Sequence, residues 1–292
     1  MNMEIIATYT DTHFQDSHAI GNKAYNLCLL YRHGFNVPPF IILTSSVFNE
    51  FLSFNNIQAE VNENLKKLNP NNYSEISQKL QSLVINSVIP NSIIERVSKS
   101  VAELGFNSVA IRSSGLTEDN KKASMAGMHS TYLNIDVNDI EFANKIKECW
   151  ASIFNRRAIL YRMANNLLSD FGMAVIIQEM VKSEYSGVVF TKHPIDNDKI
   201  LLEYTKGSCD ELVNGKITPS SLSFYRDSTN FISGNLNEVP LNVFSGIITE
   251  SIKIENLMKS PQDIEWCVDK ELKLWILQSR SISVNNTFKS IF

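Results

Sequence analysis

The sequence has few cysteines, few glycines and no long hydrophobic run. Its 292 residues include only 4 cysteines and 11 glycines. The cysteines are Cys28, Cys149, Cys209 and Cys267. They lie far apart and form no CxxC pair, so neither a structural zinc site nor a dithiol redox motif is favoured. Apolar neighbours around Cys28 and Cys149 indicate ordinary buried thiols, as expected in a reducing compartment.

No segment approaches the roughly 18 apolar residues that a membrane-spanning helix needs. The N-terminal segment MNMEIIATYTDTHF contains acidic residues and lacks the apolar core of a signal peptide. We therefore expect a cytoplasmic protein with no membrane association. The formal net charge of -4 and the pI near 5.8 provide no basic field, which argues against nucleic acid as the main ligand.

Several common catalytic motifs are also absent from the sequence. It contains no GxxxxGK[ST] P-loop and no GxGxxG after a strand, nor the GxSxG and HExxH motifs of serine hydrolases and zinc proteases. The histidines are scattered, at positions 13, 18, 33, 129 and 193. His129 and His193 are candidates for an acid or base, although polar surface histidines are the simpler interpretation.

Hydrophobic periodicity predicts alternating helices and strands, followed by a strand-rich final third. Helices are expected over residues 22–33, after a cap at 44–46, over 92–104 and over 139–165, with a strand over 40–43. The later strands are expected over 173–180, 187–191, 200–204, 222–225, 264–268 and 272–277. These short runs are typical of a mainly antiparallel sheet.

The stretch VAIRSSGLTEDNKKASMAGMHSTYLN, residues 109–134, has features of a phosphate site. Arg112 follows a short apolar run that predicts a buried strand, so its guanidinium is expected at the strand end, able to bind phosphate oxygens. The small residues around Gly127 allow backbone N–H groups to approach a polyphosphate, and Thr131 adds a hydroxyl. From spacing alone, a surface ion pair for Arg112 remains the alternative.

This segment resembles the ATP-binding domain of the phosphoenolpyruvate synthase and pyruvate phosphate dikinase family, whose pattern reads RSSAxxED followed by SxAGxxxTYLN. The likeness continues in order along nearly the whole chain, in GNKAYNLCLLYRHGFNVPPFIILT, AVIIQEMVKSEYSGVVFTKHP, EYTKGSCDELVNGKITP and PQDIEWCVDKELKLWILQSRSI. Five ordered blocks are far more specific than any single short motif.

The resemblance implies an α+β protein with the ATP-grasp fold, in which nucleotide lies between two lobes. We expect the N-terminal lobe over residues 1–185 and the sheet-rich C-terminal lobe over 186–292, with the border near residues 184–186.

The resemblance also implies a set of nucleotide-binding residues. Those that match the family are Lys23, Arg112, Gly127, Thr131, Gln178, Glu203, Gln278 and Arg280. Lys23 and Arg112 match phosphate-binding residues, and a lysine near a helix start adds its charge to the helix dipole. Gln178 matches a residue near the adenine, and Glu203 an acidic position close to the nucleotide.

The last block implies the metal site. Glu265 and Gln278 resemble the Mg²⁺-proximal pair of the family, and oxygen donors suit Mg²⁺. Arg280 is expected to face the triphosphate, on the same side of its strand as Gln278. Lys23, Arg112 and Arg280 would then be the catalytic residues, which position and neutralise the phosphates.

Two departures from the family pattern affect the expected function. GSCD stands at residues 207–210 where the family has GLGE, which puts the phosphate contacts of that loop in doubt, and RSI replaces RPI at 280–282. In addition, no histidine lies in a TCHAAI-type phosphohistidine motif. Transfer from ATP through histidine to an acceptor is therefore expected to need a separate phosphohistidine chain.

Three functions follow from these expectations. The first is the ATP–Mg²⁺-binding, phosphoryl-donating subunit of a split dikinase-like phosphotransferase. The second is a free-standing ATP-grasp kinase or ligase that phosphorylates a small acceptor directly, for example a carboxylate activated for amide formation. The third is a non-catalytic nucleotide-binding protein, against which the near-complete phosphate and metal set argues. Loops such as residues 55–74 and 227–239 would shape an acceptor pocket, but their composition names no acceptor.

Overall fold

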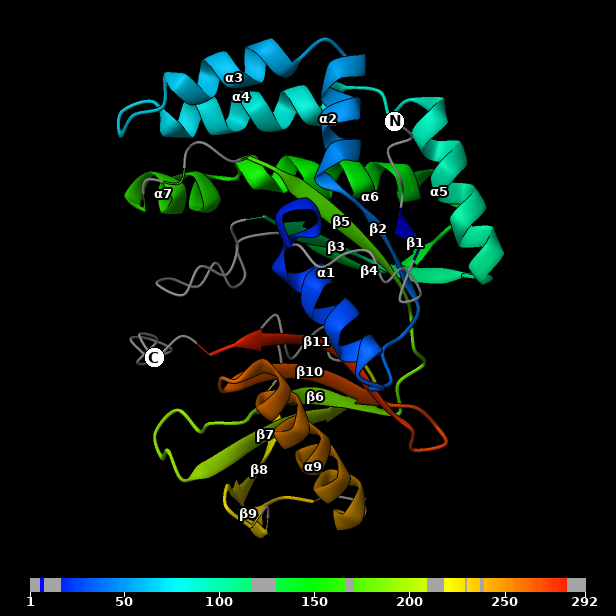
Figure 1. Cartoon of the computed structure of the whole chain (residues 1–292), viewed down its shortest axis with the longest axis vertical. Helices are drawn as coiled ribbons and strands as arrows, with labels where there is room; N and C mark the ends of the chain where they lie inside the picture. The colour runs from blue at the N-terminus through cyan, green and yellow to red at the C-terminus, as the bar shows by residue number, and fades with distance from the viewer. Residues whose placement is uncertain are drawn as a thin grey trace. The chain divides into compact units, whose positions relative to one another are not determined.

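The computed structural model describes residues 6–7, 17–116, 130–165, 167, 171–208, 218–228, 230–236 and 239–282. These residues divide into two compact units (Figure 1). The first unit contains the described residues up to Cys28, from Pro39 to Leu116 and from Ser130 to Met180. The second contains residues 29–38 and the described residues from Val181 onward. Each unit has its own antiparallel sheet with helices, so the predicted α+β class is confirmed.

The sheet of the first unit has five strands in the order β1-β2-β5-β3-β4. Their bounds are β1 Ile6–Ala7, β2 Phe40–Leu43, β3 Ser108–Gly115, β4 Thr131–Asp136 and β5 Met173–Glu179. All neighbouring strands are antiparallel. One face of this sheet is apolar and belongs to the main hydrophobic core, through Ile41, Leu43, Val109, Ile111, Val175 and Ile177.

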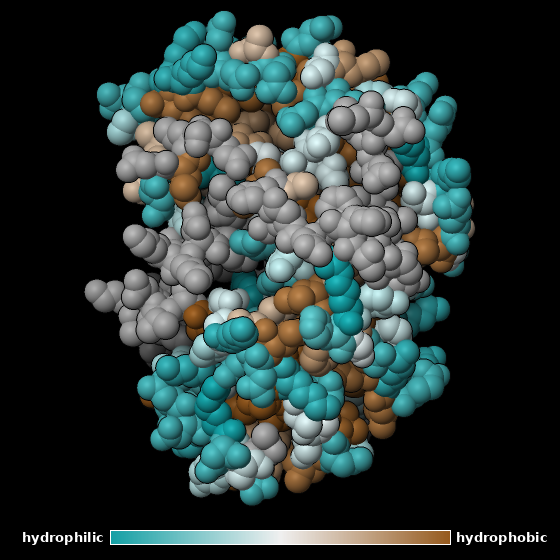
Figure 2. Space-filling view, in the orientation of Figure 1, coloured by the Kyte–Doolittle hydropathy of each residue, from teal (hydrophilic) through white to brown (hydrophobic). Residues whose placement is uncertain are grey.

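Helices cover that apolar face. The helical segments that contribute to this core are α2 Ser45–Phe54, α3 Gln58–Lys66, α4 Tyr73–Asn86, α5 Asn91–Leu104, α6 Ile140–Ala151, the 3₁₀ turn η1 Ser152–Phe154 and α7 Arg156–Ala164. Helix α1, Ser17–Arg32, instead packs against the end of β3. The Phe51 ring lies 4.9 Å from that of Trp150, which joins α2 to α6. The outer surfaces of α3 and α4 are hydrophilic, with hydrophobic residues beneath them (Figure 2).

The single helix predicted over residues 139–165 is wrong. The chain forms α6, η1 and α7 instead, and the break lies at Asn155, whose backbone is extended. The Asn155 side chain accepts a hydrogen bond from the N–H of Ala158 at 2.8 Å, so it caps the start of α7. Asparagine is one of the residues preferred at the N-cap of a helix. A search for hydrophobic periodicity does not detect such a cap. The predicted cap at Thr44 also differs, because Thr44 precedes α2 but makes no side-chain capping bond.

Gly21 interrupts α1 and lets it pack closely on β3. Its φ of 73° is left-handed, and a Cβ built there would lie 2.4 Å from Oγ of Ser114. The Ser114 hydroxyl donates to the carbonyl of Ile20 at 2.7 Å and accepts from the N–H of Ala24 at 3.2 Å. The regular part of α1 therefore starts after Gly21, as the sequence predicts, and Ser114 holds its first turn against the end of β3.

The sheet of the second unit has six strands in the order β11-β10-β6-β7-β8-β9. Their bounds are β6 Tyr185–Phe190, β7 Lys199–Lys206, β8 Ser220–Tyr225, β9 Phe231–Gly234, β10 Gln262–Val268 and β11 Leu274–Ser281. Helix α9, Leu241–Met258, packs on one face of this sheet, where the ring of Phe244 lies 4.7 Å from that of Tyr204. In the described part of the chain, no helix is long and apolar enough to cross a membrane.

Replacing Gly21 should destabilise the protein more than replacing another left-handed glycine. Gly21→Ala adds a Cβ that clashes with Ser114, whereas Gly105 has nearly the same φ, 71°, and nothing within 4 Å of its Cβ position. We expect Gly105→Ala to cost about 1 kcal/mol from backbone strain alone. Gly21→Ala should cost about 2 kcal/mol more, because the neighbouring backbone must move. Urea unfolding of both variants measures the difference, and equal losses would contradict the close packing of α1 on β3.

Candidate nucleotide-binding site

Three of the predicted site residues lie on one face of the first sheet. Arg112 is directly opposite Thr131 on β4 and opposite Ile176 on β5, and Gln178 is opposite Ala110 on β3. Side chains directly opposite each other share a face, and those two positions apart along a strand do so as well. Since Ile111 and Ile177 face the helix-covered core, Arg112, Thr131 and Gln178 belong to the other face.

Lys23 lies beside the end of β3. Its Nζ donates to the backbone carbonyl of Ser113 at 3.2 Å, next to the buried Arg112. Lys23 is in the first regular turn of α1 after Gly21, where N–H groups and the helix dipole favour an anion. The structure thus brings Lys23, Arg112 and Thr131 together at one end of β3. Gly127, the fourth predicted phosphate-site residue of this region, lies outside the described residues.

Cys149 lies close to this group but is held as a buried thiol. Its Sγ donates weakly to the carbonyls of Ile111, at 3.7 Å, and Ser130, at 3.8 Å. Burial raises the thiol pKa, and the nearby charge of Lys23 only partly offsets this effect. Cys149 therefore stays protonated and packs as a small hydrophobic residue, and the predicted burial of Cys28 and Cys149 is confirmed.

Gln178 carries a buried polar atom that lacks a partner. The residue is 1% exposed, and its Nε2 makes no hydrogen bond with the described residues. An unsatisfied buried amide costs free energy, and an acceptor that reached this N–H₂ group would remove that cost. A purine ring nitrogen is such an acceptor.

The remaining predicted residues share one face of the second sheet. Glu203 on β7 is opposite Val188 on β6, Val188 is opposite Glu265 on β10, and Glu265 is opposite Gln278 on β11. Arg280 lies two residues beyond Gln278, so it shares their face, as the sequence predicts. The opposite face carries residues such as Leu202 and Ile264 and is the one that packs on α9.

Two side-chain pairs organise this polar face. Nε2 of Gln278 donates to Oε1 of Glu265 at 3.3 Å, which supports the expected pairing of these residues. Nε of Arg280 donates to Oδ2 of Asp263 at 2.7 Å in a mostly buried ion pair. Sequence reasoning missed Asp263. The signal was present in QDIEW, because Asp263 and Glu265 are two residues apart in a strand and therefore share a face.

Burial makes these carboxylates costly in their charged form. It raises the pKa of Glu203, and the nearby Asp263 raises it further. Burial also raises the pKa of Asp263, although the Arg280 guanidinium lowers it. A carboxylate cluster with raised pKa values gains free energy from a bound cation, and such groups are frequent at functional sites.

Metal-binding capacity in the described residues is limited to sparse oxygen donors. Within those ranges no group of three or more His, Cys, Asp or Glu residues could hold a metal ion. Glu265 and Gln278 offer neighbouring side-chain oxygens, which fits Mg²⁺, because this ion usually takes one or two protein ligands and fills its shell with phosphate oxygens and water. The donor set does not suit Zn²⁺, which prefers sulfur and nitrogen.

The described histidine side chains have local roles. Nδ1 of His193 accepts hydrogen bonds from the N–H groups of Ile195, at 3.1 Å, and Asp196, at 3.2 Å, so this side chain stabilises a turn. His33 contacts the carbonyl of Leu29 within its own helix end, at 2.9 Å. His129 lies outside the described residues.

Comparison with known proteins shows the family of this chain. The chain matches the family model of the pyruvate phosphate dikinase AMP/ATP-binding domain over residues 17–251 and 243–290. The chain belongs to this family. Membership, together with helices and two antiparallel sheets, agrees with the ATP-grasp fold expected from the sequence.

Two relatives have names that state an activity. The chain is 30% identical to a probable phosphoenolpyruvate synthase of Methanothermobacter thermautotrophicus, over 96% of this chain and 46% of that protein. It is 29% identical to the rifampicin phosphotransferase of Bacillus cereus, over 90% of this chain and 34% of that protein. The chain thus spans less than half the length of either relative.

Among solved structures, the chain is distantly similar to D-alanyl-alanine synthetase A of Vibrio cholerae. The identity is 10% and the TM-score 0.41, over 91% of this chain and 58% of that one.

The pKa of Glu203 predicts how its replacement affects stability at different pH values. A carboxyl whose folded-state pKa is raised loses stability as the pH rises from its unfolded pKa through its folded pKa. Glu203→Gln removes this loss. The difference in free energy of unfolding, variant minus original protein, should therefore increase as the pH rises from the unfolded to the folded pKa of Glu203, and it should stay constant at higher pH. Urea unfolding between pH 4 and 8 measures the difference.

The same replacement of Glu203 in an Asp263→Asn protein serves as the control for this experiment. Because Asp263 contributes to the raised pKa of Glu203, the advantage of Glu203→Gln should be smaller in an Asp263→Asn protein. A difference that does not change with pH, or one that favours glutamate as the pH rises, would contradict this electrostatic description.

Proposed function

We propose that this chain is the nucleotide-binding, phosphoryl-donating part of an ATP–Mg²⁺-dependent phosphotransferase of the dikinase type. The observation that carries this proposal is the placement of the predicted residues. In each unit they gather on the sheet face that the hydrophobic core leaves available, with a cationic group on the first sheet and oxygen donors beside an arginine on the second.

Each residue has a role in the proposed site. Lys23, Arg112 and Arg280 position the phosphates and offset their charge. Thr131 adds a hydroxyl, and the proposed contribution of Gly127 is a backbone N–H donor. Gln178 donates its buried N–H₂ to the adenine. Glu265 and Gln278 would hold Mg²⁺, which supplies charge neutralisation at the phosphates, and Glu203 lies on the same sheet face close to them.

Arg280 needs a partner that keeps it in place. Asp263 accepts hydrogen bonds from the guanidinium and is itself mostly buried, so it fixes the direction in which Arg280 points. In phosphoryl transfer, positioning and charge stabilisation supply most of the rate acceleration, and a preoriented arginine contributes to both.

The phosphoryl acceptor is proposed to be a histidine outside these 292 residues. None of the five histidines lies in a TCHAAI-type motif, and His193 supports a turn. We therefore propose that the group passes from ATP to a histidine on a separate chain, which becomes a phosphohistidine, and from there to the final substrate.

A second candidate is direct phosphorylation of a small molecule by the chain itself. The name of the rifampicin phosphotransferase shows that at least one relative acts on a small molecule. Phosphorus NMR with ATP and Mg²⁺ distinguishes the candidates. AMP formed only with a macromolecular fraction of cell extract supports the phosphohistidine route, whereas ADP or AMP formed with a small-molecule fraction supports direct transfer.

Replacing one charged residue on each sheet should weaken Mg-ATP binding without unfolding the protein. Arg112→Gln removes a charged donor to phosphate, and Glu265→Gln removes the charge of a Mg²⁺ ligand. We expect each to raise the Kd for Mg-ATP by about 10-fold or more, because charged hydrogen bonds carry roughly that free energy. Isothermal titration calorimetry measures the Kd.

Matched controls exist on the same units. Arg96→Gln changes an arginine on α5 that pairs with Glu50, and Glu271→Gln changes an exposed glutamate between β10 and β11. Both controls should bind Mg-ATP normally. If Arg112→Gln and Glu265→Gln also bind Mg-ATP like the original protein, the assignment of the site is wrong.

Gln178→Leu should separate stability from binding. The change removes a buried amide nitrogen that has no partner among the described residues, so the free protein should be equally stable or up to about 1 kcal/mol more stable. Binding of Mg-ATP should weaken, since the donor to adenine is lost. Thermal unfolding with and without Mg-ATP tests both statements. A large loss of stability without nucleotide would show that Gln178 is satisfied by the protein itself.

A further inference from the structure

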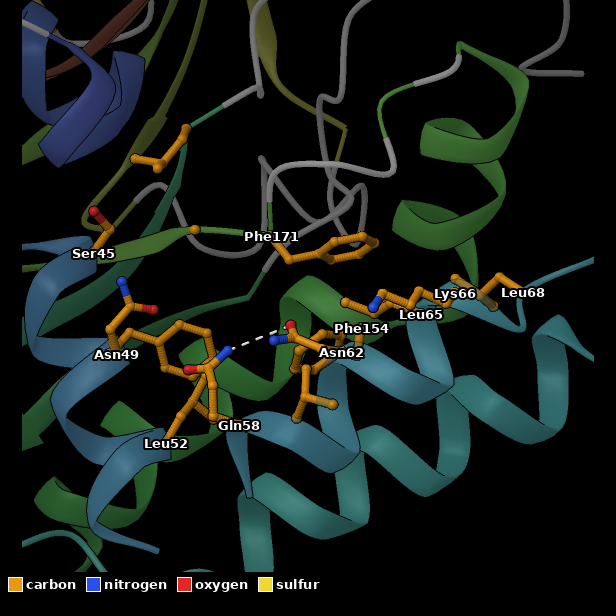
Figure 3. A pocket seen from close by; sticks show the side chains of 14 residues that line it. Ser45, Asn49, Leu52, Gln58, Asn62, Leu65, Lys66, Leu68, Phe154 and Phe171 are labelled. Carbon is orange, nitrogen blue, oxygen red and sulfur yellow. Dashed lines mark hydrogen bonds between the residues drawn. The ribbon is translucent and has the colours of Figure 1, made fainter. Parts of the chain in front are cut away.

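The first unit contains a pocket that the nucleotide residues do not use. Its volume is about 690 Å³, and α2, α3 and η1 form much of its wall (Figure 3). Of its fourteen lining residues, those that matter most for a ligand are Gln58, Asn62, Leu65, Lys66, Leu68 and Phe171. This volume is in the range of pockets that bind small organic molecules.

The pocket lies on the helix-covered side of the first sheet. Phe48, Leu52, Val61 and Phe154 belong to the main hydrophobic core, together with the apolar face of the sheet. Arg112, Thr131 and Gln178 are on the opposite face. A ligand in the pocket would therefore be separate from a nucleotide bound to those residues.

Phe171 is the aromatic residue of the pocket wall that keeps exposed surface, whereas Phe48 and Phe154 are buried behind it. The ring of Phe171 stacks on that of Phe154, with 5.8 Å between centroids and 22° between planes. The guanidinium carbon of the fully buried Arg162 lies 4.7 Å from the centroid of Phe171. Contact with both neighbours restricts the orientation of the Phe171 ring, so its exposed part is preorganised to contact an apolar group.

Polar groups line the side formed by α3. Gln58, Asn62 and Lys66 recur every four residues, so they follow one another along a single side of the helix, and Gln58 donates to Asn62 at 3.5 Å. Figure 3 shows this row facing the pocket below Phe171. Lys66 is the one charged residue among the fourteen that line the pocket, and none of them is acidic. The lining therefore favours a ligand with a single negative charge.

We propose that this pocket binds a small carboxylate with an aromatic body, at a site separate from the nucleotide residues. The aromatic part contacts the exposed part of Phe171 and the half-buried side chains of Leu65 and Leu68. The carboxylate accepts hydrogen bonds from the Lys66 ammonium and from the amide of Asn62. The exposed parts of the apolar side chains supply the contact area, and the Lys66 ammonium favours a ligand with a negative charge.

The test uses 2-naphthoate, with the neutral 2-naphthamide as the matched ligand. Both have the same ring system, so they differ only in the group expected at Lys66. Ligand-observed NMR titrations on the full chain, with and without saturating Mg-ATP, measure both affinities. We expect 2-naphthoate to bind at one site with an affinity that Mg-ATP does not reduce by competition, and to bind about 10-fold more tightly than 2-naphthamide.

Two pairs of variants test the residues. Lys66→Glu should lower the affinity for 2-naphthoate about 10-fold or more and leave the affinity for 2-naphthamide nearly unchanged. Its control is Lys67→Glu, the next residue, which pairs with Glu63 on the surface and does not line the pocket. Asn62→Trp should fill the pocket and weaken the binding of both ligands. Glu63→Trp, at the neighbouring exposed position, should change the affinity of neither ligand.

Three results would overturn the proposal. The first is the absence of saturable binding of 2-naphthoate. The second is its displacement by Mg-ATP, which would place it among the nucleotide residues. The third is an equal effect of Lys66→Glu and Lys67→Glu, which would reduce the interaction to general surface charge. None of these results depends on whether the chain transfers a phosphoryl group, so this proposal and the proposed function can fail independently.

Discussion

Antiparallel pairing places directly opposite side chains on the same face of a sheet, and this constraint determines where each candidate residue lies. In both sheets one face is apolar and packs under helices. Polar side chains are tolerated only on the other face, because burying them in the core without partners is costly. Arg112 and Gln178 in one sheet, and Glu265 and Gln278 in the other, are thus gathered by register across strands that are distant in the sequence.

The polar faces of the two sheets contain buried groups that lower the stability of the protein when no ligand is bound. Gln178 buries an amide nitrogen that has no partner in the described part of the chain, and burial raises the pKa values of Glu203 and Asp263. Folding tolerates these costs because the two cores are extensive. A nucleotide with a bound cation would relieve both, since it offers acceptors to the amide and positive charge to the carboxylates. Binding and stability are therefore expected to be linked.

Elements with strong local signals could be predicted from the sequence. The strand Phe40–Leu43 and the start of regular helix after Gly21 are confirmed, and the strand pattern of the final third is largely confirmed. The break at Asn155 was missed because a capping side chain interrupts an unchanged apolar period. Asp263 was missed although its spacing from Glu265 was visible, because only the sheet register shows that it contacts Arg280. The pocket beside α3 depends on how helices pack on the sheet, which no local pattern encodes.

The central proposal is that the polar face of each sheet contacts Mg-ATP. Backbone amide hydrogen exchange of the full chain, with and without saturating Mg-ATP, tests it most directly because it reads each sheet separately. The account predicts slower exchange with Mg-ATP around Arg112 on β3 and Gln178 on β5, and around Glu265 on β10 and Gln278 on β11. Unchanged exchange in either group of strands would contradict the account.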